Sequence, residues 1–363
     1  MKVNWREINA ASNTFAVLSA ACGKAGYALY PVRSPERDIT CYSLNSINVS
    51  RFKEEIADAE CITIVGGPHA TACYREVTSW ADYVVVGEGE QSLPALLRHL
   101  EGEEKEIPPG VATRDRYTPP PYTVFLDAFP PFSVIKGYVE ISRGCPHRCG
   151  YCQTPRIFGC TMRHRSIDTI TEWAHRYRDI RMVSPNAFAY GSDGRTPRWE
   201  KVELLLRGLK GNIFFGTFPS EVRPEFITGH ALELVTSYCA NTRLAFGAQS
   251  GSDRVLSALH RGHTVFDVEV AVDRCRDAGL LPIVDFILGL PMESQEDQED
   301  TLRLIGDIVR KGRARVHRFL PLPGTPLARS AGGIILPEVQ RLLGKLALKG
   351  VVTGSWSGGD TIL

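Results

Sequence analysis

The sequence predicts an α/β protein with two parts, a short doubly wound domain and a partial (β/α)6 barrel that follows it. Two early apolar runs, at residues 61–65 and 83–86, each end in glycines and lead into a helical stretch. From residue 137 onward, a longer series of β-rich runs alternates with helical stretches. Strands that alternate with helices form parallel sheets, and six consecutive repeats suit a partial barrel.

The front domain is expected at residues 1–105. Its clearest strands are Cys61–Val65, which ends in a Gly-Gly turn, and Tyr83–Val86, which is followed by a Gly-Glu-Gly-Glu loop and a helix from about Ser92. The domain is short for a doubly wound fold, so we expect one or more early strands to be missing or rearranged.

Residues 106–136 are rich in proline and are predicted to be a linker between the domains. The barrel is expected at 137–330, with strands at 138–142, 180–185, 212–218, 242–249, 281–290 and 314–322. A C-terminal extension, 331–363, should hold one amphipathic helix, Pro337–Leu348, and a Gly/Ser-rich end. In such barrels the reactive groups stand at the C-terminal ends of the strands.

Composition limits the classes of partner. Of the 363 residues, 42 are Lys or Arg and 41 are Asp or Glu, so the net charge is +1. This balance suits a peptide or small molecule better than a polyanionic nucleic acid. No apolar run reaches the about 18 to 20 residues of a membrane span, and the charged N-terminus makes a poor signal peptide. We therefore expect a cytoplasmic protein with no membrane partner.

Three of the ten cysteines are clustered, in the stretch SRGCPHRCGYCQTP. Cys145, Cys149 and Cys152 follow a C-x-x-x-C-x-x-C spacing directly after a predicted strand, and Gly144 and Gly150 are expected to let the loop curl. A zinc site completed by His147 is one alternative, although structural zinc sites usually use four ligands in two separated pairs. Iron–sulfur clusters also usually take four cysteines, so three thiolates suggest a cluster with one iron open to a ligand.

This loop closely resembles the signature of the radical S-adenosylmethionine (SAM) superfamily, including the aromatic Tyr151 before the last cysteine. The resemblance implies a [4Fe–4S] cluster on Cys145, Cys149 and Cys152, whose fourth iron binds SAM. It further implies that an electron from the cluster cleaves SAM to methionine and a 5′-deoxyadenosyl radical. The same superfamily uses a partial (β/α) barrel with the cluster loop after its first strand.

Stretches after the later strands resemble the SAM-binding segments of that superfamily, although each alone could be an ordinary strand end with turn glycines. SPNAFAYG, FPSEVRPE, GAQSGSDRVL and VDFILGLPMES occur in the expected order. A cationic side chain such as Arg223 suits the SAM carboxylate. The implied SAM-binding residues are Asn186, Tyr190, Ser220, Glu221, Arg223, Gln249, Ser250, Ile287 and Gly289.

GGPHATA and VVGEGEQSLPALL, in the front domain, resemble the cobalamin-binding domain of one radical SAM subfamily. Glycines at a strand end let a flat ligand approach the sheet edge, and a following helix points its N-terminus there. The alternative is a nucleotide-binding-like fold that has lost its ligand. No D-x-H-x-x-G stretch is present, so we expect no histidine on the lower face of cobalt. The implied residues are Gly66, Gly67, Pro68, His69, Gly87, Glu88, Gly89 and Glu90.

The resemblance implies a cobalamin-dependent radical SAM C-methyltransferase that needs an electron donor. One SAM would methylate cobalamin, a second would generate the radical, and the substrate radical would take the methyl group. The candidate substrate is a protein or peptide, with the Cα of a glutamine in methyl-coenzyme M reductase suggested by likeness to archaeal members, or a small molecule. Two alternatives are a tRNA methylthiotransferase, which needs a second cluster on front-domain cysteines, and a non-catalytic cobalamin or redox sensor.

Overall fold

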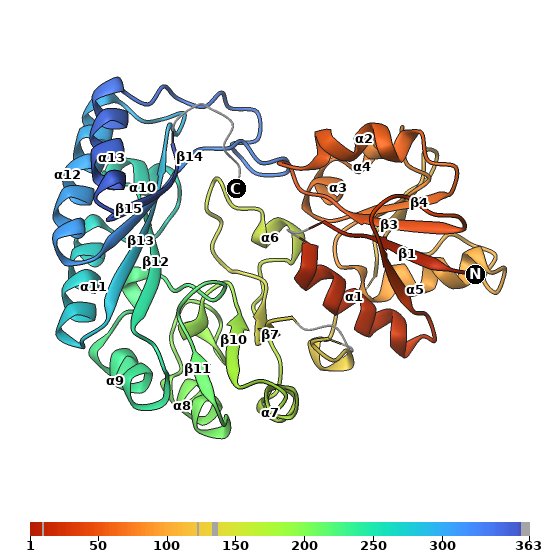
Figure 1. Cartoon of the computed structure of the whole chain (residues 1–363), viewed down its shortest axis with the longest axis horizontal. Helices are drawn as coiled ribbons and strands as arrows, with labels where there is room; N and C mark the ends of the chain where they lie inside the picture. The colour runs from red at the N-terminus through yellow and green to blue at the C-terminus, as the bar shows by residue number, and fades with distance from the viewer. Residues whose placement is uncertain (9–10, 122, 133–136, 357–363) are drawn as a thin grey trace. The chain divides into compact units, whose positions relative to one another are not determined.

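The computed structural model describes residues 1–8, 11–121, 123–132 and 137–356 of the chain, shown in Figure 1. The chain divides into two compact units. Unit 1 comprises Met1–Tyr138 and Arg156–Phe158, and unit 2 comprises Val139–Pro155 and Gly159–Leu363. Within the described part of the chain, every helix is too short or too polar to cross a bilayer.

Unit 1 contains one six-stranded sheet with helices on both faces (Figure 1). Its elements in chain order are β1 (Val3–Arg6), α1 (Ser12–Lys24), β2 (Leu29–Val32), β3 (Ile39–Ser43), α2 (Val49–Ala57), β4 (Ile62–Gly66), α3 (Pro68–Ala72), α4 (Tyr74–Val77), β5 (Tyr83–Val85), α5 (Gly89–Leu100), β6 (Val111–Ala112) and η2 (Leu126–Ala128).

The strand order of unit 1 is β2-β1-β3-β4-β5-β6, and the first five strands are parallel. The order 2-1-3-4-5 is a common doubly wound arrangement, so the expectation of missing or rearranged early strands is wrong. The shortness of the domain has another cause. Residues 33–38 join β2 to β3 without a helix, whereas such a crossover usually contains one.

Apolar side chains cover both faces of this sheet, as a parallel sheet requires. On one face, Ile64 and Val85 pack with residues of α1 and α5, such as Cys22 and Leu96. On the other face, the core includes Phe52 of α2, together with side chains from α3 and α4. The C-terminal ends of β4 and β5 are left as an edge that carries loops and the starts of α3 and α5.

Part of the stretch predicted as a linker forms an edge strand. β6 lies inside the 106–136 segment and pairs antiparallel with β5, Val84 opposite Ala112 and Val85 opposite Val111. The short strand is buried. The proline-rich composition predicted irregular chain, which is found around β6. It gave no indication that two apolar residues within the segment complete the sheet.

Unit 2 is built from strand–helix repeats. Its elements, including the short helix at the boundary of the units, are β7 (Val139–Glu140), β8 (Ser142–Arg143), α6 (Thr154–Ile157), β9 (Arg163–His164), α7 (Ile167–Ala174), β10 (Asp179–Val183), η3 (Ala187–Ala189), α8 (Trp199–Gly208), β11 (Asn212–Phe214), η4 (Pro224–Phe226), α9 (Gly229–Tyr238), β12 (Arg243–Gln249), α10 (Asp253–Ala258), α11 (Val265–Asp277), β13 (Leu281–Leu288), α12 (Gln295–Lys311), β14 (Arg313–Arg318), α13 (Pro337–Leu348) and β15 (Val352–Ser355).

Seven of these strands form an arc in chain order with helices on its outer side (Figure 1). The sheet β7-β10-β11 and the sheet β12-β13-β14-β15 are both parallel. A parallel bridge between Val222 and Phe246 links the two sheets. Helix starts follow local sequence: Thr264 and Ser294 form capping boxes with Asp267 and Asp297 at the N-termini of α11 and α12.

The strand β15 departs from the sequence prediction. The residues after α13 were expected to be a Gly/Ser-rich end, but Val352–Ser355 pair parallel with β14 and extend the arc by one strand. Gly354 fits there because a Cβ at this position would lie 1.9 Å from the carbonyl oxygen of Val316. The pairing of β15 with β14 therefore requires glycine at position 354, whereas in the sequence alone the glycines here indicate an irregular end.

Candidate functional site

The three clustered cysteines lie on a loop of unit 2, residues 144–161, which we call the cysteine loop. The antiparallel pair β8·β9 closes it, with Ser142 opposite His164 and Arg143 opposite Arg163. Gly144 begins the loop at φ +83°, and a Cβ there would lie 2.2 Å from the carbonyl oxygen of Thr161. Only glycine fits this position.

Gly150 has a different role from the one predicted. Its φ is not positive, and a Cβ would meet Leu327 at an ordinary 3.5 Å. Its backbone instead fastens the loop: its N–H donates to the carbonyl of Leu259 at 3.0 Å, and its carbonyl accepts from the N–H of Leu327 at 3.3 Å. The side-chain amide of Gln153 adds a hydrogen bond to the carbonyl of Pro323 at 2.8 Å.

A buried ion network supports the base of the cysteine loop. Arg143 donates two hydrogen bonds to the carboxylate of Glu140, at 2.8 and 2.9 Å, and Arg165 donates a third at 3.1 Å. Burial alone would raise the pKa of Glu140, but the two guanidinium groups lower it below its ordinary value. The carboxylate therefore stays ionised. The network holds the end of β7 against β8 and against the residue that follows β9.

His164 connects the β8·β9 pair to the loop after β10 by hydrogen bonds. Its Nδ1 accepts from the hydroxyl of Ser142 at 2.8 Å and from the N–H of Gly191 at 3.2 Å, so its Nε2 carries the proton and donates to the carbonyl of Ser192 at 2.7 Å. Burial lowers the pKa of His164, which keeps the ring neutral.

The sulfurs of Cys145, Cys149 and Cys152 do not all lie within 4.8 Å of one another. Cys149 is buried and the other two are half-buried. A tetrahedral zinc ion holds its sulfurs about 3.8 Å apart. In the described part of the chain, only His69, Cys73 and Glu76 bring three such ligand atoms within 4.8 Å of one another, so at least two of the cysteine-loop sulfurs lie farther apart than that. An iron–sulfur cubane binds each thiolate at a separate corner and does not need the three sulfurs to converge on one ion.

His147 does not act as a fourth ligand in this arrangement. Its Nε2 donates to the carbonyl of Gly194 at 3.2 Å, and burial followed by the charge of Arg223 lowers its pKa to about 4. The ring is neutral and ties the loop to the segment after β10. The structure therefore favours the cluster interpretation over a zinc site.

Two guanidinium groups lie close to the cysteine loop. Arg261 is buried and its Nη1 lies 3.7 Å from the sulfur of Cys149 and 3.0 Å from the hydroxyl of Tyr151, while its Nη2 donates to the carbonyl of Gly247 at 2.8 Å. Arg223, also buried, donates to the carboxylate of Glu225 and to the carbonyl of Arg261. Positive charge at this position favours thiolates over thiols.

Arg261 was not among the predicted residues, although it lies in the stretch ALHRGHT after β12. Nothing in the local pattern distinguishes it from a surface arginine. Arg223 was predicted to bind the SAM carboxylate, but two of its nitrogens are used within the protein. Its charge also lowers the pKa of the Cys145 thiol, against the larger effect of burial, which raises it.

Ser220 and Ser250 are fully buried, and their hydroxyls are used inside the fold. The hydroxyl of Ser220 donates to the carbonyl of Thr217 at 3.0 Å, within a turn that follows β11. The hydroxyl of Ser250 lies 3.3 Å from that of Thr301 in α12. Tyr190 is similar, since its hydroxyl donates to the carbonyl of Arg165 at 2.7 Å. The hydroxyl protons of Ser220 and Tyr190 are engaged within the fold, and a SAM contact of any of these three side chains stays a prediction.

Asn186 and Thr217 offer such groups at neighbouring strand ends. Asn186 is 4% exposed, and neither atom of its side-chain amide has a hydrogen-bond partner. The hydroxyl of Thr217, a residue the sequence interpretation missed, is also buried and unpaired. The N–H of Ser184 donates to the carbonyl of Pro219, which joins the two segments. Unsatisfied buried polar atoms at strand ends are what a polar ligand would pair.

The remaining predicted residues lie at the ends of β11, β12 and β13. Gln249 has φ +75° at a register shift, and its amide lies back over Gly247. Ile287 and Tyr151 each pack against one apolar cluster that contains Leu259 and Leu290. An aromatic residue of the cysteine loop and a predicted SAM-binding residue therefore share this cluster.

Gly289 has φ +74° and its N–H donates to the carboxylate of Glu293 at 2.7 Å. Burial raises the pKa of Glu293 to about 7, against the lowering effect of the amides of Gly289 and Leu290. Glu221 is bound by Arg315, at 3.1 Å, which also pairs with Asp285. Burial raises the pKa of Asp285 to about 6.

In unit 1, the predicted residues form what we call the glycine edge, residues 66–69 and 87–90 at the ends of β4 and β5. Gly67 has φ +96°, and a Cβ there would lie 2.6 Å from the carbonyl oxygen of Leu44, whereas a Cβ at Gly87 would meet nothing within 4 Å. The N–H of Gly87 donates to the hydroxyl of Thr71 at 3.0 Å, which connects the two halves of the edge.

The other members of the glycine edge start helices or are buried in them. Pro68 occupies the first turn of α3, where it needs no N–H partner, and Glu88 is the N-cap residue of α5. Gly89 and Glu90 form the first turn of α5, and the Glu90 side chain is buried. His69 is 9% exposed, and neither of its ring nitrogens has a hydrogen-bond partner.

Comparisons with known proteins agree with this geometry. Residues 139–305 match the family model of the radical SAM superfamily. A tRNA-2-methylthio-N(6)-dimethylallyladenosine synthase of Anaplasma phagocytophilum (strain HZ) is 26% identical over 313 residues, covering 82% of this chain and 68% of the relative.

Among solved structures, the radical SAM methyltransferase TsrM of Kitasatospora setae, with cobalamin and a [4Fe–4S] cluster bound, gives a TM-score of 0.68 at 16% identity. That match covers 90% of this chain and 74% of TsrM. The cobalamin-dependent radical SAM enzyme OxsB, with aqua-cobalamin and SAM bound, gives 0.67 at 15% identity and covers 97% of this chain and 57% of OxsB. The family match, the cysteine loop and the parallel arc together identify residues 139–305 as a radical SAM domain, in a chain with the fold of cobalamin-dependent radical SAM enzymes.

Proposed function

We propose that this protein is a cobalamin-dependent radical SAM C-methyltransferase. The observation that carries the proposal is that one chain combines a C-x-x-x-C-x-x-C loop with a 2-1-3-4-5 sheet that ends in a glycine edge. Solved structures of the same fold bind cobalamin, and one of them is a methyltransferase. When bound, the cluster supplies the electron that cleaves SAM, and cobalamin supplies the methyl group.

The residues of unit 2 divide the work of holding cluster and SAM. Cys145, Cys149 and Cys152 hold the cluster, and Arg261 keeps positive charge beside Cys149. Asn186 and Thr217 pair the polar end of SAM with their unsatisfied atoms. Tyr151 and Ile287 supply an apolar surface for its base.

The glycine edge of unit 1 binds the corrin. Gly67 lets the backbone of the β4 turn pack against Leu44, and the open space at Gly87 leaves room for a broad ligand. We do not assign His69 as a cobalt ligand, in keeping with the expectation that the lower face of cobalt has no histidine ligand.

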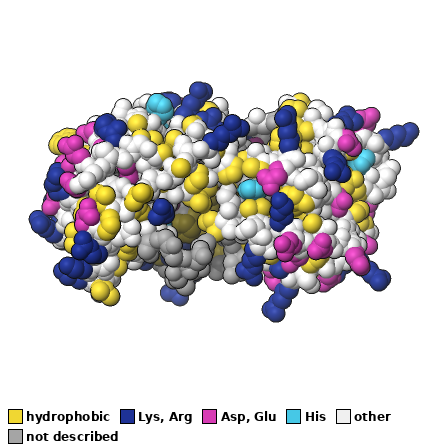
Figure 2. All heavy atoms as spheres, turned by 90° about the horizontal axis from the view of Figure 1, so that it is seen from above, with side chains coloured by type: hydrophobic (Ala, Val, Ile, Leu, Met, Phe, Trp, Pro, Cys, Tyr) yellow, Lys and Arg dark blue, Asp and Glu magenta, His cyan; other side chains and the backbone are white. Residues whose placement is uncertain are grey.

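The substrate is an unactivated carbon of a protein, a peptide or a small molecule. Figure 2 shows basic and acidic side chains interspersed on the face it presents, in keeping with the net charge of +1. This pattern favours a weakly charged substrate over a polyanion. The glutamine Cα of methyl-coenzyme M reductase is our candidate, and mass spectrometry of peptides from a host that lacks this gene should reveal a peptide lighter by one methylene.

The central test is anaerobic reconstitution with iron, sulfide and cobalamin, followed by gel filtration. We expect a corrinoid spectrum that elutes with the protein, about four irons per chain, and 5′-deoxyadenosine after reduction in the presence of SAM. A protein that elutes without corrinoid would contradict methyl transfer from cobalamin. Corrinoid binding with no SAM cleavage after reduction would identify a sensor.

The SAM contacts are tested separately. Asn186→Ala should weaken SAM binding about 10- to 150-fold, since a buried hydrogen bond to a charged group is worth about 1.5 to 3 kcal/mol. Ser250→Ala is the matched control, because its hydroxyl already pairs with Thr301. Equal SAM affinities in the two variants would remove Asn186 from the site.

A tRNA methylthiotransferase is the second candidate, because the relative from Anaplasma phagocytophilum is a tRNA-2-methylthio-N(6)-dimethylallyladenosine synthase. The positions of the front cysteines weigh against it. Cys22 lies in α1 and Cys41 in β3, both buried, and only Cys73 lies near the C-terminal strand ends. About eight irons per chain, instead of about four, would favour this candidate.

A further inference from the structure

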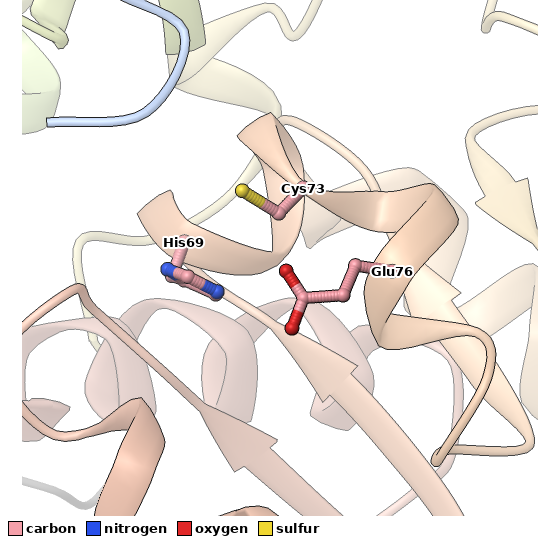
Figure 3. A group of neighbouring side chains, drawn as sticks. All are labelled: His69, Cys73 and Glu76. Carbon is pink, nitrogen blue, oxygen red and sulfur yellow. The ribbon is translucent and has the colours of Figure 1, made fainter. Parts of the chain in front are cut away.

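A second group of metal-type ligands lies in unit 1, outside the cysteine loop. His69 in α3, Cys73 at the end of that helix and Glu76 in α4 each offer one ligand atom, and all three atoms lie within 4.8 Å of one another. Figure 3 shows the three side chains around a common space, with the Glu76 carboxylate directed toward the His69 ring. His69 and Cys73 lie about one turn apart, Cys73 at the end of α3, and Glu76 follows in the separate short helix α4.

The histidine of this group lacks the partners that a buried ring normally has. His69 is 9% exposed, and both ring nitrogens are buried without a hydrogen bond. Buried polar atoms in proteins are nearly always paired, so an unpaired ring next to a thiol and a carboxylate indicates a missing ligand. A neutral imidazole nitrogen has a lone pair to donate to a metal ion.

The other two ligands are accessible and only weakly engaged. Cys73 is half-buried, and the carboxylate of Glu76 is 55% exposed. Its ion-pair partner, Lys53, lies 3.4 Å away and is 49% exposed. Exposed ion pairs of this kind contribute little, so a cation can displace the ammonium of Lys53 readily.

The donor set selects the kind of ion. Magnesium and calcium prefer oxygen ligands, whereas imidazole, thiolate and carboxylate together suit zinc. We propose that His69, Cys73 and Glu76 form a zinc site with its fourth position open to water or to another ligand.

None of its three ligands belongs to the cysteine loop, so its ligand set differs from that of the [4Fe–4S] cluster. Its position on α3 gives it a structural role. Thr71 of the same helix accepts the hydrogen bond from Gly87, so an ion that fixes α3 also fixes the glycine edge. Only this role rests on the proposed function; the zinc site itself does not.

The test uses the full chain reconstituted anaerobically with its cluster, exposed to a slight excess of zinc chloride and desalted. Zinc and iron are counted by mass spectrometry, and zinc K-edge absorption reads the zinc ligands without interference from iron. We expect one zinc per chain with one sulfur neighbour at about 2.3 Å. No retained zinc would overturn the proposal, and so would a zinc with three sulfur neighbours, which would place it on the cysteine loop.

Three variants locate the ion. Cys73→Ser should remove the sulfur neighbour and weaken zinc binding more than about tenfold, the lower limit of what even an outer-shell partner contributes. Glu76→Gln changes an exposed side chain, so it should fold normally, keep the sulfur neighbour and bind zinc about tenfold more weakly. Cys61→Ser is the control, since Cys61 is a half-buried cysteine of the same unit whose thiol contacts Thr40.

Cys61→Ser should leave the zinc content and the sulfur neighbour unchanged. If Cys73→Ser kept the sulfur neighbour, the assignment would be wrong. Iron is counted in every sample, so failure of the cluster appears as missing iron, while failure of the zinc site appears as missing zinc with iron retained.

Discussion

In the cysteine loop of unit 2, the groups around the sulfurs are charged and paired, whereas in the glycine edge of unit 1 four of the eight residues are glycines. Arg223 and Arg261 surround the first region with guanidinium groups that are fixed by Glu225 and by main-chain carbonyls. The second region offers Gly87, where a Cβ would meet no atom within 4 Å.

The difference follows from what each region has to hold. Thiolates and a small charged cluster need fixed positive charge, because burial penalises the ionised sulfurs. A flat, neutral ligand needs shape and access, which glycines at strand ends provide. The first region should therefore be sensitive to charge and to single ligands, and the second to added volume.

Loss of one sulfur should have the largest effect. Cys149→Ala removes a cluster ligand, and we expect no detectable 5′-deoxyadenosine after reduction with SAM, together with loss of iron. Cobalamin should still elute with the protein, because the glycine edge lies in the other unit. Cys160→Ala is the control, since Cys160 is an exposed cysteine in the same loop. SAM cleavage at the normal rate by Cys149→Ala would show that the cluster lies elsewhere.

Added volume should separate two pairs of glycines that all have positive φ values. Gly144→Ala and Gly67→Ala place a Cβ at 2.2 and 2.6 Å from a carbonyl oxygen, whereas the same change at Gly159 or Gly87 meets nothing within 4 Å. All four residues have positive φ. We expect the first two variants to lose about 3 kcal/mol of unfolding free energy and the other two about 1 kcal/mol.

Denaturant unfolding of the four variants measures this difference. The two units supply one crowded and one open position each, so the result tests both regions with the same substitution. Equal losses of unfolding free energy in all four variants would mean that backbone conformation alone sets the cost. The close approach of a carbonyl oxygen at Gly144 and at Gly67 would then be contradicted.

Sequence patterns specified the cysteine loop and the barrel more fully than the side-chain partners around them. The three cysteines and Gly144 act within a few residues, so their spacing carries the information. Arg261 could not be found this way, because it reaches Cys149 from 112 residues further along the chain. Ser220 and Ser250 occupy strand ends as expected, but only the structure shows that their hydroxyls pair inside the fold.

The same reasoning applies to the fold. Helices were predicted where an amphipathic run is visible, as at Pro337–Leu348, because that signal is local. The strands β6 and β15 were missed because each is short and lies in a segment with many prolines or glycines. Their pairing with β5 and β14 is decided by tertiary packing, which overrides local propensity.

A pH-dependent contribution to stability should come from Glu293, which binds the end of β13. Its folded pKa is raised from 4.5 to about 7 by burial. A raised pKa means that its contribution to stability is fully present below about pH 4.5 and is lost as the pH rises through about 7. Relative to Glu293→Gln, the wild-type protein should lose about 2 to 3 kcal/mol between pH 4.5 and pH 8. Unfolding free energies of both proteins at the two pH values measure the change. Oε1 of Glu293 is buried without a hydrogen-bond partner. If the stability difference between the two proteins did not vary with pH, this burial of the carboxyl group would be contradicted.

The smallest effect, and the sharpest test of charge in the cysteine loop, concerns Arg261. Its Nη1 lies 3.7 Å from the sulfur of Cys149, so its charge stabilises the more negative, reduced cluster. Arg261→Gln should lower the reduction potential of the cluster by on the order of tens of millivolts, because charge and hydrogen bonds to the sulfurs set such potentials. Arg261→Lys keeps the charge and should move the potential less, although it loses the hydrogen bond to Tyr151. Redox titration followed by electron paramagnetic resonance reads the potential directly. A potential that both substitutions leave unchanged would mean that the loop holds its cluster by shape alone, as the glycine edge holds its ligand.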